Sequence, residues 1–165
     1  MQLVRLLYFS RNRLAHCGGS IDEGLAGLIA ACAAQNRRDR ISGLLVHDEK
    51  WFVQAIEGDA TVVSRTFERI LRDRRHSDVT LIEMQPVAAR RYGSAPMGGI
   101  ARDADNAGIF VHYAEGPRFE PQLMPADRLG DLVEALLRDA AKCPTKSRSA
   151  FRGMPWTTGN VTNAA

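Results

Sequence analysis

The sequence predicts an α+β fold on three observations. Apolar runs typical of strands alternate with segments whose apolar residues recur every three or four positions, as in amphipathic helices. The segments follow the order strand, helix, strand, strand, helix, strand. The two middle strands are joined by a short polar turn, as in a hairpin. This order is the ferredoxin-like arrangement, a sheet with two helices on one face, and a short extra strand is expected at its edge.

The composition is that of an ordinary soluble protein, with 165 residues, 45% hydrophobic and 25% charged. The net charge of +3 is small and the charges are interspersed, so neither nucleic acid nor a membrane is favoured as a partner. Three distant cysteines and four histidines without metal-ligand spacing predict neither a disulfide framework nor a metal site. Because no signal peptide or membrane-spanning stretch is predicted, a cytoplasmic location is expected.

The first strand is predicted over residues 2–10, where both faces are apolar, as in a central strand. Ser20 and Glu23 have the spacing of a capping box and predict the start of a helix. Asn36 continues the apolar stripe of that helix, so its amide is expected to point inward near the helix end. The stripe itself consists of Leu25, Leu28, Ile29 and Cys32.

The hairpin is predicted from residues 41–47 and 51–57, with a polar turn between them. A second helix is expected from about residue 60 to residue 73, followed by a basic terminus over 72–76. Its inward-facing residues are expected to be Val63, Phe67, Ile70 and Leu71.

The fourth strand is predicted over residues 79–84, and a short fifth strand over 97–101. A short helix over 105–113 and an amphipathic helix over 127–142 follow, and these C-terminal helices are expected to cover the other face of the sheet. The chain is therefore expected to divide into a domain over 1–102, a helical extension over 103–143 and a flexible tail over 144–165.

Polar side chains interrupt the apolar pattern at Tyr8, Asn36 and Gln54. An unpaired buried carboxamide costs about 1–3 kcal/mol, so these groups need partners. Taken singly, each has an ordinary structural explanation. Gln54 can be a core amide paired with backbone, Tyr8 a core ring with its hydroxyl at the surface, and Asn36 a residue that ends a helix.

Several blocks with their spacing carry more information than these single residues. Over roughly residues 1–102 the sequence resembles the BLUF domain, the blue-light sensor using flavin. The two later helices resemble those of short, single-domain members that carry no effector enzyme. The blocks are Leu3–Ser10, Asn36 with Ile41–Leu45, Phe52–Gly58 and Arg72–His76.

The resemblance implies a flavin bound non-covalently between the two helices, FAD being typical and FMN the alternative. Tyr8 and Gln54 match the photoactive pair of the family, and Asn36 matches the asparagine that bonds the ring edge. Met97 matches the methionine that couples the pocket to the fifth strand. The further implied contacts with the ring, ribityl chain or phosphate are Leu28, Arg69, Ile70, Asp73, Arg75 and His76.

The resemblance implies a light switch and not an enzyme. Electron and proton transfer from Tyr8 through Gln54 would rearrange the hydrogen bonds at the flavin, and the change would pass through the fifth strand and the C-terminal helices to a partner protein. A homo-oligomer is also expected.

Two positions depart from the family: Ala95 stands where many members have tryptophan, and Gln35 where histidine or asparagine is commoner. Met97 is therefore expected to stay inward, without a tryptophan exchange.

Other classes of protein fit the sequence less well. The ferredoxin-like fold and the pI near 9 allow an RNA-binding module, but the basic-aromatic block of such domains is absent. A small enzyme on the same fold lacks paired carboxylates, a nucleophile-base pair and a glycine-rich phosphate loop. A pigment-free interaction module is the remaining alternative, and the colour of the purified protein separates it.

Overall fold

A computed structural model describes residues 2–18, 20–114 and 116–142 and contains a five-stranded sheet in the order β4-β1-β3-β2-β5. The first four strands confirm the ferredoxin-like arrangement, and the expected extra strand lies at the edge, parallel to β2. The other neighbouring strands are antiparallel. The strands are β1 (Leu3–Asn12), β2 (Ser42–His47), β3 (Trp51–Asp59), β4 (His76–Pro86) and β5 (Gly98–Ala101).

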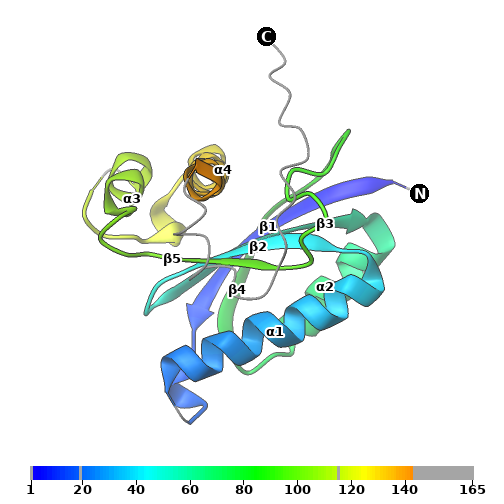
Figure 1. The fold of residues 1–165 in the computed structure, drawn as a ribbon, viewed down its shortest axis with the longest axis horizontal. Helices are drawn as coiled ribbons and strands as arrows, with labels where there is room; N and C mark the ends of the chain where they lie inside the picture. The colour runs from blue at the N-terminus through cyan, green and yellow to red at the C-terminus, as the bar shows by residue number, and fades with distance from the viewer. Residues whose placement is uncertain (1, 19, 115, 143–165) are drawn as a thin grey trace.

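Helices cover both faces of the sheet (Figure 1), α1 and α2 on one face and α3 and α4 on the other. β1 and β3 are central and buried on both faces, so each face has its own apolar core. This two-sided burial explains why their sequences show apolar residues at nearly every position. The helices are α1 (Ile21–Asp39), α2 (Ala60–Leu71), α3 (Ala107–Ala114) and α4 (Ala126–Lys142), with short 3-10 helices at Leu14–His16 and Pro121–Leu123.

The predicted start of α1 is confirmed, because the Ser20 hydroxyl accepts a hydrogen bond from the Glu23 N–H at 3.2 Å. The helix ends at Asp39, followed by Arg40 in the left-handed region at φ 54°. α2 begins in a similar way, with the Asp59 carboxylate accepting from the Thr61 N–H. These side-chain caps fix the starts of α1 and α2.

The predicted end of α2 is wrong in two respects. The helix ends at Leu71, and His76 is the first residue of β4 and not part of a helix terminus. Leu71 was expected inward but its side chain is 53% exposed. On an ideal helix it lies about 80° beyond Val63, outside the face that contacts the sheet. Thr66 is buried in α2 in its stead.

α3 and α4 confirm the two helices predicted after the sheet, and α4 packs its apolar stripe into the core on this second face. The predicted tail over 144–165 lies outside the described residues. Within 2–18, 20–114 and 116–142, no helix is long and apolar enough to cross a membrane. The same residues contain no group of three metal-ligating side chains. The fully buried residues of the stripe are Leu129, Leu132, Val133 and Leu136.

Candidate functional site

The antiparallel register of β1 and β3 places Tyr8 directly opposite Gln54. Both side chains lie in the core on the α1 and α2 face of the sheet, 0% and 4% exposed. The Tyr8 hydroxyl donates to Gln54 Oε1, and Gln54 Nε2 donates to the sulfur of Met97 at 3.3 Å. A phenol, an amide and a thioether are therefore joined in one hydrogen-bonded chain, and Met97 lies inward as expected.

The surroundings of Tyr8 keep its phenol protonated. Burial raises the pKa of Tyr8 well above its usual value, and nearby Cys32 and Asp73 raise it further. The Phe67 ring packs against it with centroids 5.5 Å apart. At neutral pH the phenol is therefore protonated, and in this structure its hydroxyl donates to the Gln54 oxygen.

Asn36 holds the chain just before Met97. Its side chain is 3% exposed, so the predicted inward position is confirmed. Its Nδ2 donates to the carbonyl of Pro96 at 2.8 Å. Asn36 and Gln54 therefore bind consecutive residues of the segment that leads into β5, and both retain amide atoms that can bond another molecule.

The predicted apolar contacts lie on the two helices that flank this chain of hydrogen bonds. Leu28 is 1% exposed and belongs to the core beneath α1, while Ile70 is partly buried and packs against the same core from α2. Other apolar side chains on the two helices are also only partly covered. These are Leu25, Ile29, Cys32, Val62 and Phe67.

The predicted charged contacts lie at the ends of the helices, and both arginines are already paired. Arg69 reaches from α2 to Asp39 at the end of α1, with 2.8 Å between Nη2 and Oδ2. Arg75 binds the carboxylate of Asp73 through Nε and Nη2. The pKa of Asp73 is lowered by its bonds to Arg75, against the effect of burial.

His76 lies beside the hydrogen-bonded residues Tyr8 and Gln54, with its ring centroid 6.2 Å from that of Tyr8. Its Nδ1 shares a hydrogen bond of 2.8 Å with the Ser10 hydroxyl, and its ring packs 4.9 Å from the Phe52 ring. Burial lowers the pKa of His76 to about 4, an effect that Asp73 opposes. The ring is therefore neutral at neutral pH.

Sequence reasoning missed Glu57, which is 0% exposed and binds Arg5 on β1. This pair lies on the α4 face of the sheet, opposite to Tyr8 and Gln54. The positions of Arg5 and Glu57 relative to Tyr8 and Gln54 in the sequence could have indicated this ion pair. Arg5 is three residues before Tyr8 and Glu57 three after Gln54, and antiparallel strands keep such residues opposite each other.

Two cavities of the described residues lie beside this site, and one of them is lined by Pro96, to which Asn36 donates. One of about 260 Å³ lies between α4 and the sheet, and one of about 570 Å³ lies near Arg37, Arg40 and Arg90. Neither is lined by Tyr8 or Gln54. We therefore place the candidate site at the buried hydrogen bonds of Tyr8, Gln54 and Met97 and the partly buried apolar residues around them.

Comparisons with known proteins assign most of the sheet and its first two helices to one family. The family model described as "BLUF: Sensors of blue-light using FAD" matches residues 3–98. Over 93 residues the chain is 36% identical to the photoactivated adenylate cyclase subunit alpha of Euglena gracilis, a match that covers 56% of this chain and 9% of that protein. The chain thus spans less than a tenth of the length of this curated relative.

Solved structures show the same fold. The dark state of BlrB, a BLUF protein, is 28% identical with a TM-score of 0.63, and the match covers 86% of this chain and 98% of that one. The photo-activated state of BlsA has a TM-score of 0.74 at 24% identity, covering 82% and 94%, which is a likeness of fold. The family model spans more than half of the residues of this chain. The chain therefore belongs to the BLUF family, the sensors of blue light using FAD.

Proposed function

We propose that the protein is a blue-light sensor that binds FAD non-covalently between α1 and α2, with Tyr8 and Gln54 as its switch. The observation that carries the proposal is the direct hydrogen bond from a fully buried phenol to a buried amide, which in turn bonds Met97. Packing alone does not require these hydrogen bonds, because a pair of apolar residues would fill the core equally well. Membership of the BLUF family supports a role for these hydrogen bonds in sensing light.

The residues present fit a flavin in their chemistry. A flavin ring has an apolar plane and one polar edge of carbonyl and N–H groups. Partly covered apolar side chains on α1 and α2 suit the plane, and the remaining donor hydrogens and acceptor lone pairs of the Asn36 and Gln54 amides suit the edge. We assign Leu28 and Ile70 to the plane, and Arg69, Asp73, Arg75 and His76 to the ring, ribityl or phosphate contacts.

The bound flavin supplies absorption of blue light and, when excited, an electron acceptor. Tyr8 would give up an electron to it, and the phenol proton would follow along the hydrogen bond through the Gln54 amide toward the flavin. When the electron and proton return, the Gln54 amide is left with its donor and acceptor ends exchanged. Both arrangements keep most hydrogen bonds, so they differ by only a few kcal/mol, as a two-state switch requires.

The output is proposed to run through β5 and the C-terminal helices to a separate partner protein. Residues 1–102 form the sensor in this proposal and 103–143 the extension that conveys the signal, with the chain itself acting as no enzyme. The photoactivated cyclase subunit from Euglena gracilis shares the matched region within a much longer protein. A homo-oligomer in solution is part of the same proposal.

The absorption spectrum tests the function directly. Purified protein is expected to be yellow, and blue light should shift its flavin absorption slightly to the red, with return in the dark. Chromatography of the released pigment distinguishes FAD from FMN. A folded, colourless protein that takes up neither FAD nor FMN would contradict the proposal and favour a pigment-free module.

The Arg75→Ala variant tests the assignment at the polar end of the flavin. Loss of a charge-assisted hydrogen bond is expected to weaken FAD binding about tenfold to a hundredfold, since such bonds contribute about 1.5–3 kcal/mol. Occupancy after gel filtration is the measurement. Arg74→Ala removes an exposed neighbouring cation and is the matched control. Equal occupancy in both variants would show that Arg75 serves only its ion pair with Asp73.

A further inference from the structure

The buried carboxylate of Glu57 fixes the start of the loop formed by residues 90–97, here called the coupling loop. Its Oε1 accepts from Arg5 Nε at 2.9 Å. Its Oε2 accepts from the main-chain N–H groups of Arg91 at 2.9 Å and Tyr92 at 3.2 Å. A buried carboxylate is kept in place by such charge-assisted bonds, so the coupling loop is anchored to β1 and β3 at this end.

The other end of the coupling loop is bound by the photoactive side of the sheet. Pro96 accepts from Asn36, and Met97 accepts from Gln54. Glu57 and Gln54 are three residues apart on the same strand and face opposite sides of the sheet. β3 thus carries a residue that holds each end of the coupling loop, Glu57 on one face of the sheet and Gln54 on the other.

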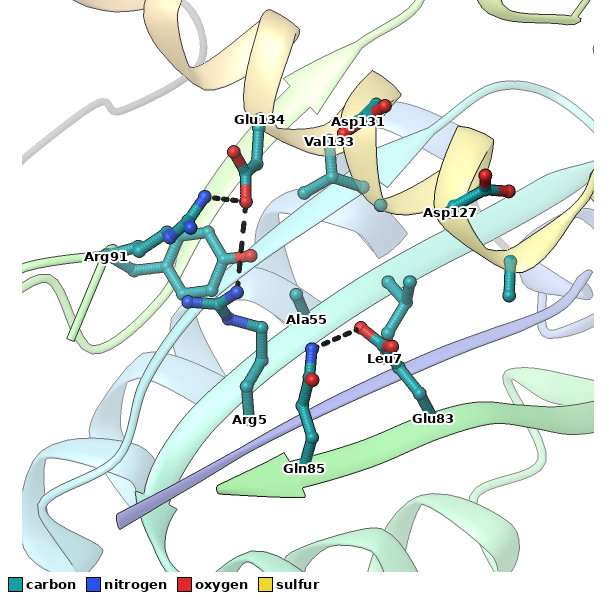
Figure 2. A pocket seen from close by; sticks show the side chains of 13 residues that line it. Arg5, Leu7, Ala55, Glu83, Gln85, Arg91, Asp127, Asp131, Val133 and Glu134 are labelled. Atoms are coloured by element: carbon teal, nitrogen blue, oxygen red, sulfur yellow. Dashed lines mark hydrogen bonds and ion pairs between the residues drawn. The ribbon is translucent and has the colours of Figure 1, made fainter. Parts of the chain in front are cut away.

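The coupling loop also contacts α4. Figure 2 shows Glu134 of α4 between the guanidinium groups of Arg91 and Arg5, at the edge of the cavity of about 260 Å³. Glu134 forms an ion pair with Arg91, and its Oε1 lies 3.8 Å from Arg5 Nη1. The Arg91 side chain is 54% exposed and the Glu134 side chain 26%, so the pair is shielded from water only on its Glu134 side.

We propose that the coupling loop carries the state of Gln54 to α4, with Glu57 as a positioning residue and the Arg91–Glu134 ion pair as the contact with the helix. This inference rests on the proposed light-sensing function. When the Gln54 amide exchanges its ends, Nε2 no longer donates to Met97 and the loop loses that tether. Because Glu57 still holds the main chain of Arg91, the loop turns about this anchor, and the turn reorients the Arg91 side chain against Glu134.

Hydrogen–deuterium exchange of the full-length, FAD-loaded protein tests this route. In wild type, the peptide covering α4 is expected to exchange differently in the dark and under blue light. Glu134→Gln and Arg91→Gln should each reduce that difference about fivefold or more while the red shift of the flavin remains. Glu83→Gln is the matched control, because Glu83 lines the same cavity but bonds Gln85. It should leave the difference unchanged.

Glu57→Gln tests the positioning role by spectroscopy. Its amide NH₂ cannot accept from Arg5 or from the loop, so the Gln54–Met97 contact should relax and dark recovery should change about fivefold or more. A wild-type recovery rate in this variant overturns the proposal. If the variant does not fold, Glu134→Gln and Arg91→Gln decide alone.

The outcomes separate the inference from the function on which it rests. A light-dependent difference in α4 that keeps its wild-type size in both Glu134→Gln and Arg91→Gln overturns the coupling loop. So does a wild-type protein whose flavin shifts to the red without any change in α4. A wild-type protein that shows no light-induced shift at all overturns the proposed function itself.

Discussion

Phenylalanine in place of Tyr8 is expected to leave FAD bound and to abolish the light-induced red shift. The substitution removes the hydroxyl that donates to Gln54 Oε1, and with it the oxidisable phenol. The ring remains and keeps its packing against Phe67, so the fold should persist. The unpaired Gln54 oxygen costs about 1–3 kcal/mol, which a domain of ordinary stability tolerates. Difference spectra before and after illumination measure the effect.

Leucine in place of Gln54 is expected to have the same result for a different reason. The phenol remains oxidisable, but no amide bridges it to the flavin or to Met97. Without an exchangeable donor and acceptor, the second state of the switch does not exist. The bound flavin should therefore return to its dark spectrum at once.

The controls for these two variants use similar residues away from the site. Tyr113→Phe removes a phenol on α3, where Tyr113 packs against His112. Gln85→Leu removes an exposed amide on β4. Both should keep a shift of normal size. A normal shift in Tyr8→Phe or Gln54→Leu would rule out the roles proposed for the pair.

Much of the fold could be predicted because burial leaves a direct record in the sequence. An apolar pattern on both faces identified β1 as central, and the structure places it between β3 and β4. The end of α2 was harder, because cations are favoured at helix ends and Arg72–His76 fitted such an end. In the structure the Asp73 carboxylate accepts from the Arg75 N–H, and this turn leads the chain into β4.

The contacts around the site could be predicted only in part. Tyr8, Asn36 and Gln54 stood out as polar residues in apolar runs, and the resemblance added Met97. The structure joins Tyr8, Gln54 and Met97 by hydrogen bonds and binds Asn36 to the neighbouring Pro96 carbonyl. What holds the coupling loop was not predicted. It depends on main-chain N–H groups bound by Glu57, and a main-chain donor has no signature in the residue types.

The free energy of unfolding is expected to fall steeply as the pH drops from about 6.5 to about 4. Burial lowers the pKa of both His47 and His76 from 6.5 to about 4. In this window the unfolded chain binds protons that the folded chain does not. The contribution of the two histidines to the free energy of unfolding is therefore fully present above pH 6.5 and is lost as the pH falls toward 4. Each histidine should contribute about 2 kcal/mol, since one pKa unit corresponds to about 1.4 kcal/mol and partial exposure reduces the effect.

Urea unfolding followed by circular dichroism at several pH values between 7 and 4 measures this loss. The pKa values of Asp39 and Asp73 are also lowered, but carboxylates with an ordinary value of 3.8 lose their contribution below this window. A variant with both His47→Gln and His76→Gln should therefore keep nearly constant stability down to pH 4.5. If that variant and wild type lose stability in parallel, groups other than these two histidines determine the acid sensitivity.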